Sequence, residues 1–236
     1  WIIKMNSILT FSKIKLLFLM LLTLCVINQA YAAVSLGATR VIYFAGEKQV
    51  KLPVINNDEK RYLIQSWIEN SEGKKDNSFV ITPPLFSMQG KKENTLRIID
   101  ATNNKLPKDR ETLFWLSVKS IPAVEKSLAN ENMLQLAIIS KIKFFYRPKD
   151  LTISPDENYK KLQFKRNNDT LIIKNPTPYF ITMTELELGG KKLENTMVPP
   201  FEDKSISIPT SAYGKLSFQT INDYGAITPK TIVDVR

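Results

Sequence analysis

The sequence predicts an all-β protein built from two β-sandwiches. After residue 33, short runs rich in Val, Ile, Phe, Tyr and Trp alternate with clusters of Asn, Asp, Gly, Lys and Pro. No long segment shows the 3.6-residue period of an amphipathic helix. The chain has 236 residues, of which 43% are apolar and 24% charged, so it has an ordinary globular composition and room for one or two domains.

The first sandwich is expected over residues 33–147. This segment contains seven strand candidates, and their number and spacing are typical of an immunoglobulin-like domain. We expect Trp67 to be a core residue of the central strand. The seven candidates are the opening stretch and residues 39–45, 49–57, 62–70, 79–84, 95–100 and 112–122.

A second, smaller sandwich is expected over residues 148–236, with "YRPKD" at 146–150 as the joint between the two domains. Pro and Gly residues separate its strands. The candidates are residues 161–167, 170–175, 179–188, 204–209, 215–223 and 231–236.

Residues 1–32 have the pattern of a cleavable signal peptide. Three lysines precede an unbroken apolar run at 16–27, which suits a signal-peptide core and is too short for a spanning helix. Ala30 and Ala32 are small, as a signal peptidase requires, so we expect cleavage after Ala32 and no membrane anchor afterwards. A retained N-terminal anchor is the alternative. The start of translation is open between Trp1 and Met5.

Most familiar catalytic and metal sites lack their usual residues here. Cys25 is the only cysteine and lies inside the signal segment, where the preceding Leu24 is too large for a lipoprotein site. The mature chain therefore has no disulfide, thiol nucleophile or thiolate metal site. It has no histidine either, which removes the commonest general base and zinc ligand. We expect no enzyme activity, no metal and no cofactor.

The net charge does not indicate a nucleic-acid-binding protein. The whole chain carries +10, and removing the three signal lysines leaves 30 basic and 23 acidic residues, a charge of +7. The lysines occur in scattered pairs such as Lys74-Lys75, which is typical of solvated turns. No recognition helix or aromatic RNA-binding motif is present.

The run at 133–148, "MLQLAIISKIKFFYRP", combines a long apolar pattern with lysines near its end. Leu134, Leu136 and Ile138 share one parity, whereas Lys143 has the other. The alternation predicts a strand, and two interpretations are open from the residues alone. The leucines and isoleucine are core residues of the first domain, or they form a face that serves a partner.

Five stretches in order resemble the PapD-like periplasmic chaperones of the chaperone–usher pilus pathway. The most specific is "LPKDRETLFWLSVKSIP" at 106–122, in which an Asp-Arg-Glu turn enters an aromatic strand; it departs from the family at Ser117, where Asn is usual. The resemblance covers essentially the whole mature chain. The other four stretches are "AVSLGATRVIY", "KIKFFYRP", "NPTPYFIT" and "INDYG".

The resemblance implies two immunoglobulin-like domains in an L or boomerang arrangement, with a cleft between them. Such proteins work in the periplasm, where they hold pilus subunits that lack one strand of their own sandwich. The chaperone lends a strand until an outer-membrane usher assembles the subunit into a fibre. The short loop at 123–133 is similar to those of chaperones for rod-like, adhesin-tipped pili. Whether the free protein caps its lent strand by forming a homodimer is left open.

The resemblance also assigns site residues. Leu134, Leu136 and Ile138 would be the apolar side chains of the lent strand, and Arg40 with Lys143 would bind the C-terminal carboxylate of the subunit. Because Lys143 has the opposite parity to the three apolar residues, a bulge or strong twist is needed if all of them face the partner.

A third set, Glu111, Arg147 and Asp223, matches a family trio that joins the two domains by salt links. Arg147 lies at the predicted joint and carries a charge that could pair with both carboxylates. We expect this set to fix the angle between the domains.

Two other classes of protein remain as alternatives. A secreted pilin or adhesin would also be a β-sandwich, but two complete domains and the "KDRETLF" stretch disfavour it. A secreted hydrolase using serine, lysine or carboxylates is disfavoured because the Gly-x-Ser-x-Gly motif is absent and no carboxylate pair stands out.

Overall fold

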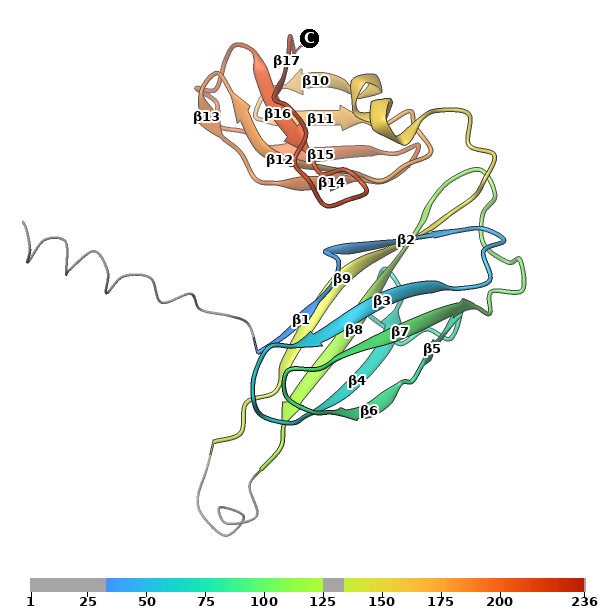
Figure 1. Ribbon diagram of the computed structural model, residues 1–236. Coiled ribbons are helices and arrows are strands. Elements are labelled where there is room, and N and C mark those ends of the chain that lie inside the picture. The colour runs from blue at the N-terminus through green and yellow to red at the C-terminus, as the bar shows by residue number, and fades with distance from the viewer. Residues whose placement is uncertain (1–32, 125–133, 236) are drawn as a thin grey trace, which may run out of the picture. The chain divides into compact units, whose positions relative to one another are not determined.

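The computed structural model describes residues 33–124 and 134–235 (Figure 1). The predicted signal peptide, its cleavage site and Cys25 lie outside the described residues, as does most of the loop at 123–133. Val34–Arg236 form one compact unit. Within the described part of the chain, no helix is long and apolar enough to cross a membrane.

The first sandwich consists of two sheets. One has the strand order β1-β3-β7-β5, and the other has the order β2-β9-β8-β4-β6. All pairs are antiparallel except β2 with β9, which run parallel. The strands are β1 (Val34–Leu36), β2 (Arg40–Phe44), β3 (Val50–Asn56), β4 (Tyr62–Glu69), β5 (Phe79–Thr82), β6 (Leu85–Met88), β7 (Glu93–Asp100), β8 (Thr112–Pro122) and β9 (Ile138–Arg147).

Aromatic rings fill the end of this core nearest to the joint. Phe79 lies 4.7 Å from Phe144 and 5.1 Å from Phe114 between ring centroids, both edge-on. Tyr43 and Tyr146 stack alongside at 6.2 Å. Buried aromatic pairs of this kind contribute about 0.5–1.5 kcal/mol beyond their area, so they hold β2, β8 and β9 together where those strands approach the joint.

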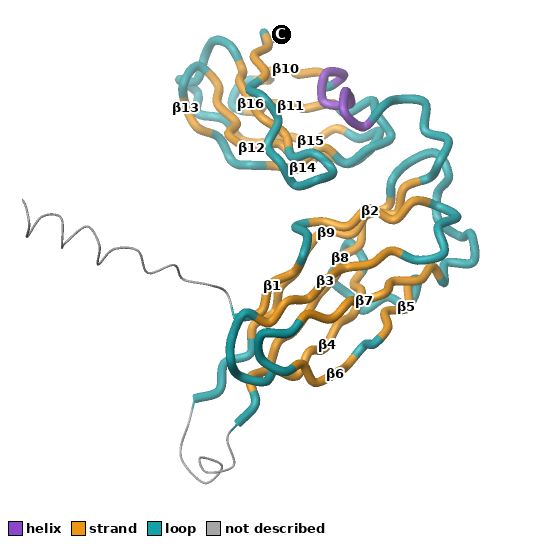
Figure 2. The backbone as a smooth tube through the Cα atoms, viewed as in Figure 1, coloured by secondary structure: helices purple, strands orange, loops and turns teal. Residues whose placement is uncertain are grey.

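The second sandwich has a three-stranded sheet, β10-β11-β15, and a five-stranded sheet in which β14 also pairs with β12. A 3-10 helix at Pro155–Lys161 precedes it (Figure 2). Its strands are β10 (Gln163–Asn167), β11 (Thr170–Lys174), β12 (Ile181–Leu188), β13 (Lys191–Lys192), β14 (Thr196–Val198), β15 (Asp203–Ser207), β16 (Leu216–Thr220) and β17 (Thr231–Val233).

The predicted all-β fold with two sandwiches is confirmed, but several details differ. The short strands β6, β13 and β14 were not among the candidates, and the run predicted as a strand from residue 133 becomes a strand only at Ile138. The 3-10 helix was not predicted, because seven residues are too few for a helical period to show. The expectation that Trp67 belongs to the core is wrong. The inward parity of β4 is taken by Ile64, Ser66 and Ile68, whereas Trp67 is half-buried on the outer face and donates its indole N–H to Glu69 at 2.6 Å.

Candidate functional site

The apolar row of β9 continues beyond the core of its own domain. Phe144 is fully buried, but residues of the same parity further towards the N-terminus are not. Ile138 is 60% exposed, Leu136 66% and Leu134 84%. These three side chains are therefore not core residues of the first sandwich, and the core interpretation of this run is wrong. They form an exposed row, which we name the apolar row.

One edge of β9 is also uncovered beside this row. β8 pairs with β9 from Ile138 to Tyr146, whereas β2 covers the opposite edge only from Lys143 onwards. No strand of the described residues lies along that edge at 138–142. Unpaired strand edges are templates for another strand. A strand added here would meet the first residue of β2, Arg40.

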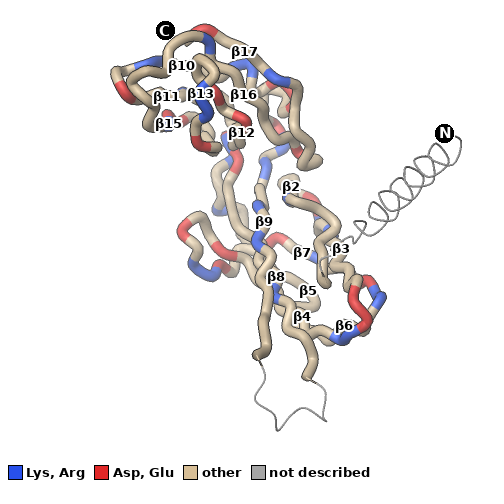
Figure 3. The backbone as a smooth tube through the Cα atoms, turned by 90° about the vertical axis from the view of Figure 1, so that its left-hand side faces the viewer, with Lys and Arg blue, Asp and Glu red and all other residues tan. Residues whose placement is uncertain are grey.

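Two cations lie where such a strand would end. Arg40 and Lys143 are direct neighbours in the parallel register of β2 and β9. Arg40 donates from Nη1 to the carbonyl oxygen of Ile221 at 3.1 Å, and Lys143 donates from Nζ to Thr182 Oγ1 at 2.9 Å. Within the described residues neither cation forms an ion pair, so both charges are available to an anion. Figure 3 shows the basic positions along β9.

The surroundings of Lys143 disfavour its positive charge. Burial, and secondly the nearby guanidinium of Arg40, together lower the pKa of the Lys143 ammonium from 10.5 to about 8. Burial also lowers the pKa of Arg40, although the charges of Asp223 and Glu111 oppose this. A bound carboxylate would relieve the repulsion between the two cations.

Ile138 and the two cations lie on opposite faces of the sheet, whereas Leu134 and Leu136 lie before β9 begins. The pairing of β8 with β9 shows no register shift, so the bulge considered from the sequence is absent. Lys143 shares the outer face with Phe145, whereas Ile138 shares the inner face with Phe144. These positions are compatible with one partner strand, because its side chains project to the faces while its terminal carboxylate lies in the plane of the sheet.

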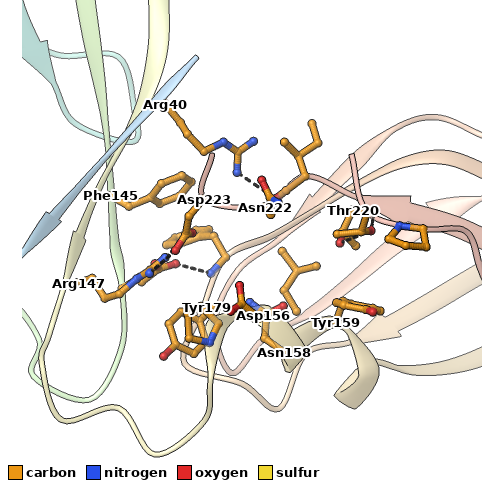
Figure 4. Close-up of a pocket in the computed structure, with 17 residues that line it drawn as sticks. Arg40, Phe145, Arg147, Asp156, Asn158, Tyr159, Tyr179, Thr220, Asn222 and Asp223 are labelled. Atoms are coloured by element: carbon orange, nitrogen blue, oxygen red, sulfur yellow. Dashed lines mark hydrogen bonds and ion pairs between the residues drawn. The ribbon is translucent and has the colours of Figure 1, made fainter. Parts of the chain in front are cut away.

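Arg147, the last residue of β9, forms a buried ion-pair network with carboxylates from two other elements (Figure 4). Its Nε donates to Glu111 Oε1 at 2.7 Å. Its two terminal nitrogens donate to Asp223, Nη1 at 2.5 Å and Nη2 at 2.7 Å. The side chains of Arg147 and Glu111 are only 6% and 2% exposed. The structure thus brings together all three residues of the predicted trio.

Hydrogen bonds complete the network on the Glu111 side. Glu111 Oε2 accepts the backbone N–H of Phe180 at 2.8 Å, and the N–H of Glu111 donates to the carbonyl of Pro178 at 2.9 Å. Burial raises the pKa of Glu111, and the charge of Arg147 opposes that rise. For Arg147, burial acts to lower the pKa, but the hydrogen bonds and charges of Asp223 and Glu111 raise it overall.

A polar pocket of about 240 Å³ adjoins this network. Its wall includes Arg40 and Asp223, together with Asn158 and Tyr159 of the 3-10 helix. Figure 4 shows Arg40 and Arg147 approaching the Asn222–Asp223 turn from β2 and β9. Arg40 and the ion-pair network therefore share the lining of one pocket.

The Asp-Arg-Glu turn has a structural role for each residue. Asp109 forms an ion pair with Arg110 at 2.8 Å, and the Arg110 guanidinium lies 4.9 Å from the ring centre of Phe201. Glu111 enters the buried network. Ser117, the departure from the family pattern, donates to Glu69 Oε1 at 3.2 Å.

Sequence reasoning missed two groups that contact the cations. Thr182 lies in the "NPTPYFIT" stretch, but no sequence pattern indicates that its hydroxyl accepts a hydrogen bond from Lys143. The Ile221 carbonyl has no side-chain signature at all, and only the approach of its turn to Arg40 reveals it. Among the described residues, no cluster of three or more acidic, histidine or cysteine side chains could hold a metal ion.

Comparison with known protein families identifies both halves of the chain. The model for "Pili and flagellar-assembly chaperone, PapD N-terminal domain" matches residues 33–152. The model for "Pili assembly chaperone PapD, C-terminal domain" matches residues 157–232. This chain belongs to the PapD family of pilus assembly chaperones. The predicted resemblance and the immunoglobulin-like fold class are thereby confirmed.

Individual relatives agree along nearly the whole chain. Chaperone protein FimC of Escherichia coli K12 is 56% identical over 213 residues, which cover 90% of this chain and 88% of FimC. The crystal structure of the periplasmic chaperone SfaE has 56% identity and a TM-score of 0.77, covering 86% of this chain and all of SfaE.

A third relative is seen with a partner. The SafB chaperone, solved in complex with the Salmonella enterica SafA pilin, has 30% identity and a TM-score of 0.79, covering 88% of this chain and 99% of that one. These relatives are named as chaperones and not as enzymes.

We predict that Arg147→Ala lowers the free energy of unfolding by about 3–5 kcal/mol, because it leaves the buried carboxylate of Glu111 without its cation. Urea denaturation measures this loss. Lys160→Ala is the matched control, since Lys160 and Glu157 form an exposed pair that contributes about 0–1 kcal/mol. Similar losses of stability in both variants would contradict this prediction. Normal stability of Arg147→Ala, with an unchanged small-angle scattering profile, would contradict the expectation that the network fixes the angle between the two domains.

We predict that Lys143→Met makes the free protein more stable near pH 7. The folded state disfavours the charged ammonium, so the unfolded chain binds more protons between pH 8 and 10.5. The stability of the unmutated protein therefore rises with pH across that window, and its deficit relative to the variant disappears above it. Thermal unfolding from pH 6 to 11 should show a difference on the order of 2 °C at neutral pH.

The exposed strand residue Lys165 supplies the control for this series as Lys165→Met. A Lys143→Met variant whose unfolding temperature parallels that of the unmutated protein at every pH would show that the surroundings of Lys143 do not disfavour its charge.

Proposed function

We propose that this chain is a periplasmic chaperone that captures pilus subunits by lending them a strand and delivers them to an outer-membrane usher. The observation that carries the proposal is the combination of an exposed apolar row before and at the start of β9, an uncovered edge of β9, and two cations where that edge ends. Family membership and the SafB–SafA complex support pilus subunits as the partners. The name of SfaE and the signal-peptide pattern support the periplasm.

The arrangement of the edge determines how a subunit strand would bind. β2 runs parallel to β9 and already covers its edge from Lys143 onwards. A subunit strand on the remaining edge ends against β2, with its terminal carboxylate at Arg40 and Lys143. It must therefore run in the same direction as β9. Backbone hydrogen bonds supply the pairing, while the apolar row enters the open groove of the subunit.

The apolar row supplies much of the driving force in this proposal. Burial of each Leu or Ile side chain contributes roughly 1.5–3 kcal/mol. Part of this gain is offset by ordering of residues 134–137, which lie outside β9 and carry a side-chain hydrogen bond from Gln135 to the carbonyl of Pro122. The row therefore gives affinity, and the carboxylate anchor fixes where the subunit strand ends.

The general test of the proposal is co-expression with neighbouring genes, followed by purification from the periplasm. A subunit should copurify with the tagged protein and be lost when the tag is absent. Copurification of no subunit from cells that assemble the pilus would contradict the proposal.

We predict that Leu136→Glu weakens subunit capture by about 30–100-fold, since it places a charge in an apolar groove. The free protein should stay folded, because this side chain is exposed. Ile232→Glu is the matched control: Ile232 is 61% exposed on β17, far along the chain from the apolar row. Unchanged capture by Leu136→Glu, or equal losses in both variants, would exclude the apolar row as the lent surface.

We predict that Arg40→Ala and Lys143→Ala each lower affinity for a peptide copying the subunit's C-terminal strand by tenfold or more. Hydrogen bonds to a charged group contribute about 1.5–3 kcal/mol. Arg40→Lys should be intermediate, since it keeps the charge but loses the planar donor pair. Calorimetry with the free-acid and amidated peptides isolates the carboxylate contribution. If the unmutated protein binds both forms equally, there is no carboxylate anchor.

A further inference from the structure

The loop Ile221–Ile227 is a compact turn of the second sandwich. It follows β16 and is closed by a bridge between Ile221 and Ile227. The side chain of Asn222 accepts the backbone N–H groups of Tyr224 at 3.1 Å and Ala226 at 2.9 Å. The backbone N–H of Gly225 donates to the carbonyl of Asn222 at 3.0 Å. These bonds make the segment a closed unit, which we name the 221–227 turn.

The 221–227 turn contacts the first sandwich at three points. Asp223 pairs with Arg147 in the buried network, and the carbonyl of Ile221 accepts from Arg40. The third point is a close approach of Gly225 to Thr39, the residue before β2. A Cβ atom built on Gly225 would lie 2.1 Å from Thr39 Oγ1 and 3.4 Å from Thr39 Cβ.

Glycine at position 225 is required for two separate reasons. Its φ of +80° lies in the left-handed region that side chains disfavour, and no space exists for a β-carbon. Thr39 is β-branched, so its side chain has few rotamers by which to move aside. A side chain at 225 therefore pushes the turn and the start of β2 apart.

Arg40 depends on this turn for its orientation. Its bond to the Ile221 carbonyl is the only side-chain hydrogen bond that Arg40 makes within the described residues. Its Nε is buried and has no partner among them. A binding group must be held within about 0.5 Å of its working position to contribute fully. Displacement of the carbonyl would leave the guanidinium without that constraint.

We propose that the 221–227 turn is the positioning element of the carboxylate anchor, with Gly225 and Thr39 setting the distance at which the Ile221 carbonyl holds Arg40. This inference rests on the proposed function of Arg40. Gly225 and Thr39 are positioning residues, because neither has to touch the carboxylate. One turn thus joins the ion-pair network, through Asp223, to the recognition of the subunit's last residue, through Ile221.

The test is the ratio of affinities for free-acid and amidated forms of the C-terminal strand peptide of the subunit that copurifies with the protein. In the full-length mature protein, Gly225→Ala should lower this ratio at least threefold, through weaker binding of the free acid alone. Binding of the amidated peptide should stay within twofold, because the apolar row and the edge of β9 are unchanged.

Two further variants separate positioning from a general loss of structure. Gly190→Ala introduces a methyl group at a nearly identical φ of +78°, but with no atom within 4 Å, so the ratio should equal that of the unmutated protein. Thr39→Ala combined with Gly225→Ala removes the atom that the new methyl group strikes. This double variant should recover most of the ratio.

The outcomes distinguish a missing carboxylate anchor from a missing positioning role of the 221–227 turn. If the unmutated protein shows no preference for the free acid, the anchor itself is refuted, and the positioning role with it. If the unmutated protein discriminates and Gly225→Ala discriminates equally well, only the positioning role is refuted. Equal losses for both peptides, or a double variant that recovers nothing, would show that the glycine acts through general stability or backbone strain and would overturn the proposal.

Discussion

The buried guanidinium of Arg147 is the constraint on which the rest of the structure depends. The Arg147 side chain is only 6% exposed, so its charge requires neighbouring carboxylates. The two carboxylates that pair with it come from different sandwiches. Glu111 precedes β8, and Asp223 follows β16. Neither sandwich alone provides both partners. The last residue of β9 is therefore satisfied only when the turn that carries Asp223 reaches the end of the first sandwich.

The two faces of β9 carry different kinds of residues, and burial and edge pairing both change along its length. At the joint, its outer face carries Arg147, and four residues earlier the same face carries Lys143. The inner face is core at Phe144 and exposed at Ile138. The strand is anchored firmly at one end, where two neighbours pair with it, and is open on one edge at the other. β9 can therefore leave one edge unpaired near Ile138 while its residues near the joint stay buried in the core.

Much of this could be predicted from the sequence, because strands and signature turns are local patterns. The alternation at 133–148 predicted a strand, which in the structure begins only at Ile138. Alternation alone could not show whether the apolar face lies in the core or in solvent, because that depends on where the neighbouring strand β2 begins. Trp67 was misassigned because a large aromatic residue is usually buried, whereas its N–H bonds to Glu69 on the outer face. The bond from Arg40 to the Ile221 carbonyl was invisible, since every residue has the same carbonyl.

The position at which β2 begins has a consequence for any strand that binds beside it. In the proposed complex the incoming strand ends at Arg40, and its register against β9 would follow by counting backwards from that residue. Side chains alternate with a period of two, so one additional residue at the end would turn every side chain of the strand to the opposite face. In the proposed complex, the residue at which β2 begins would thus set the register of the partner strand, counted from the partner's last residue.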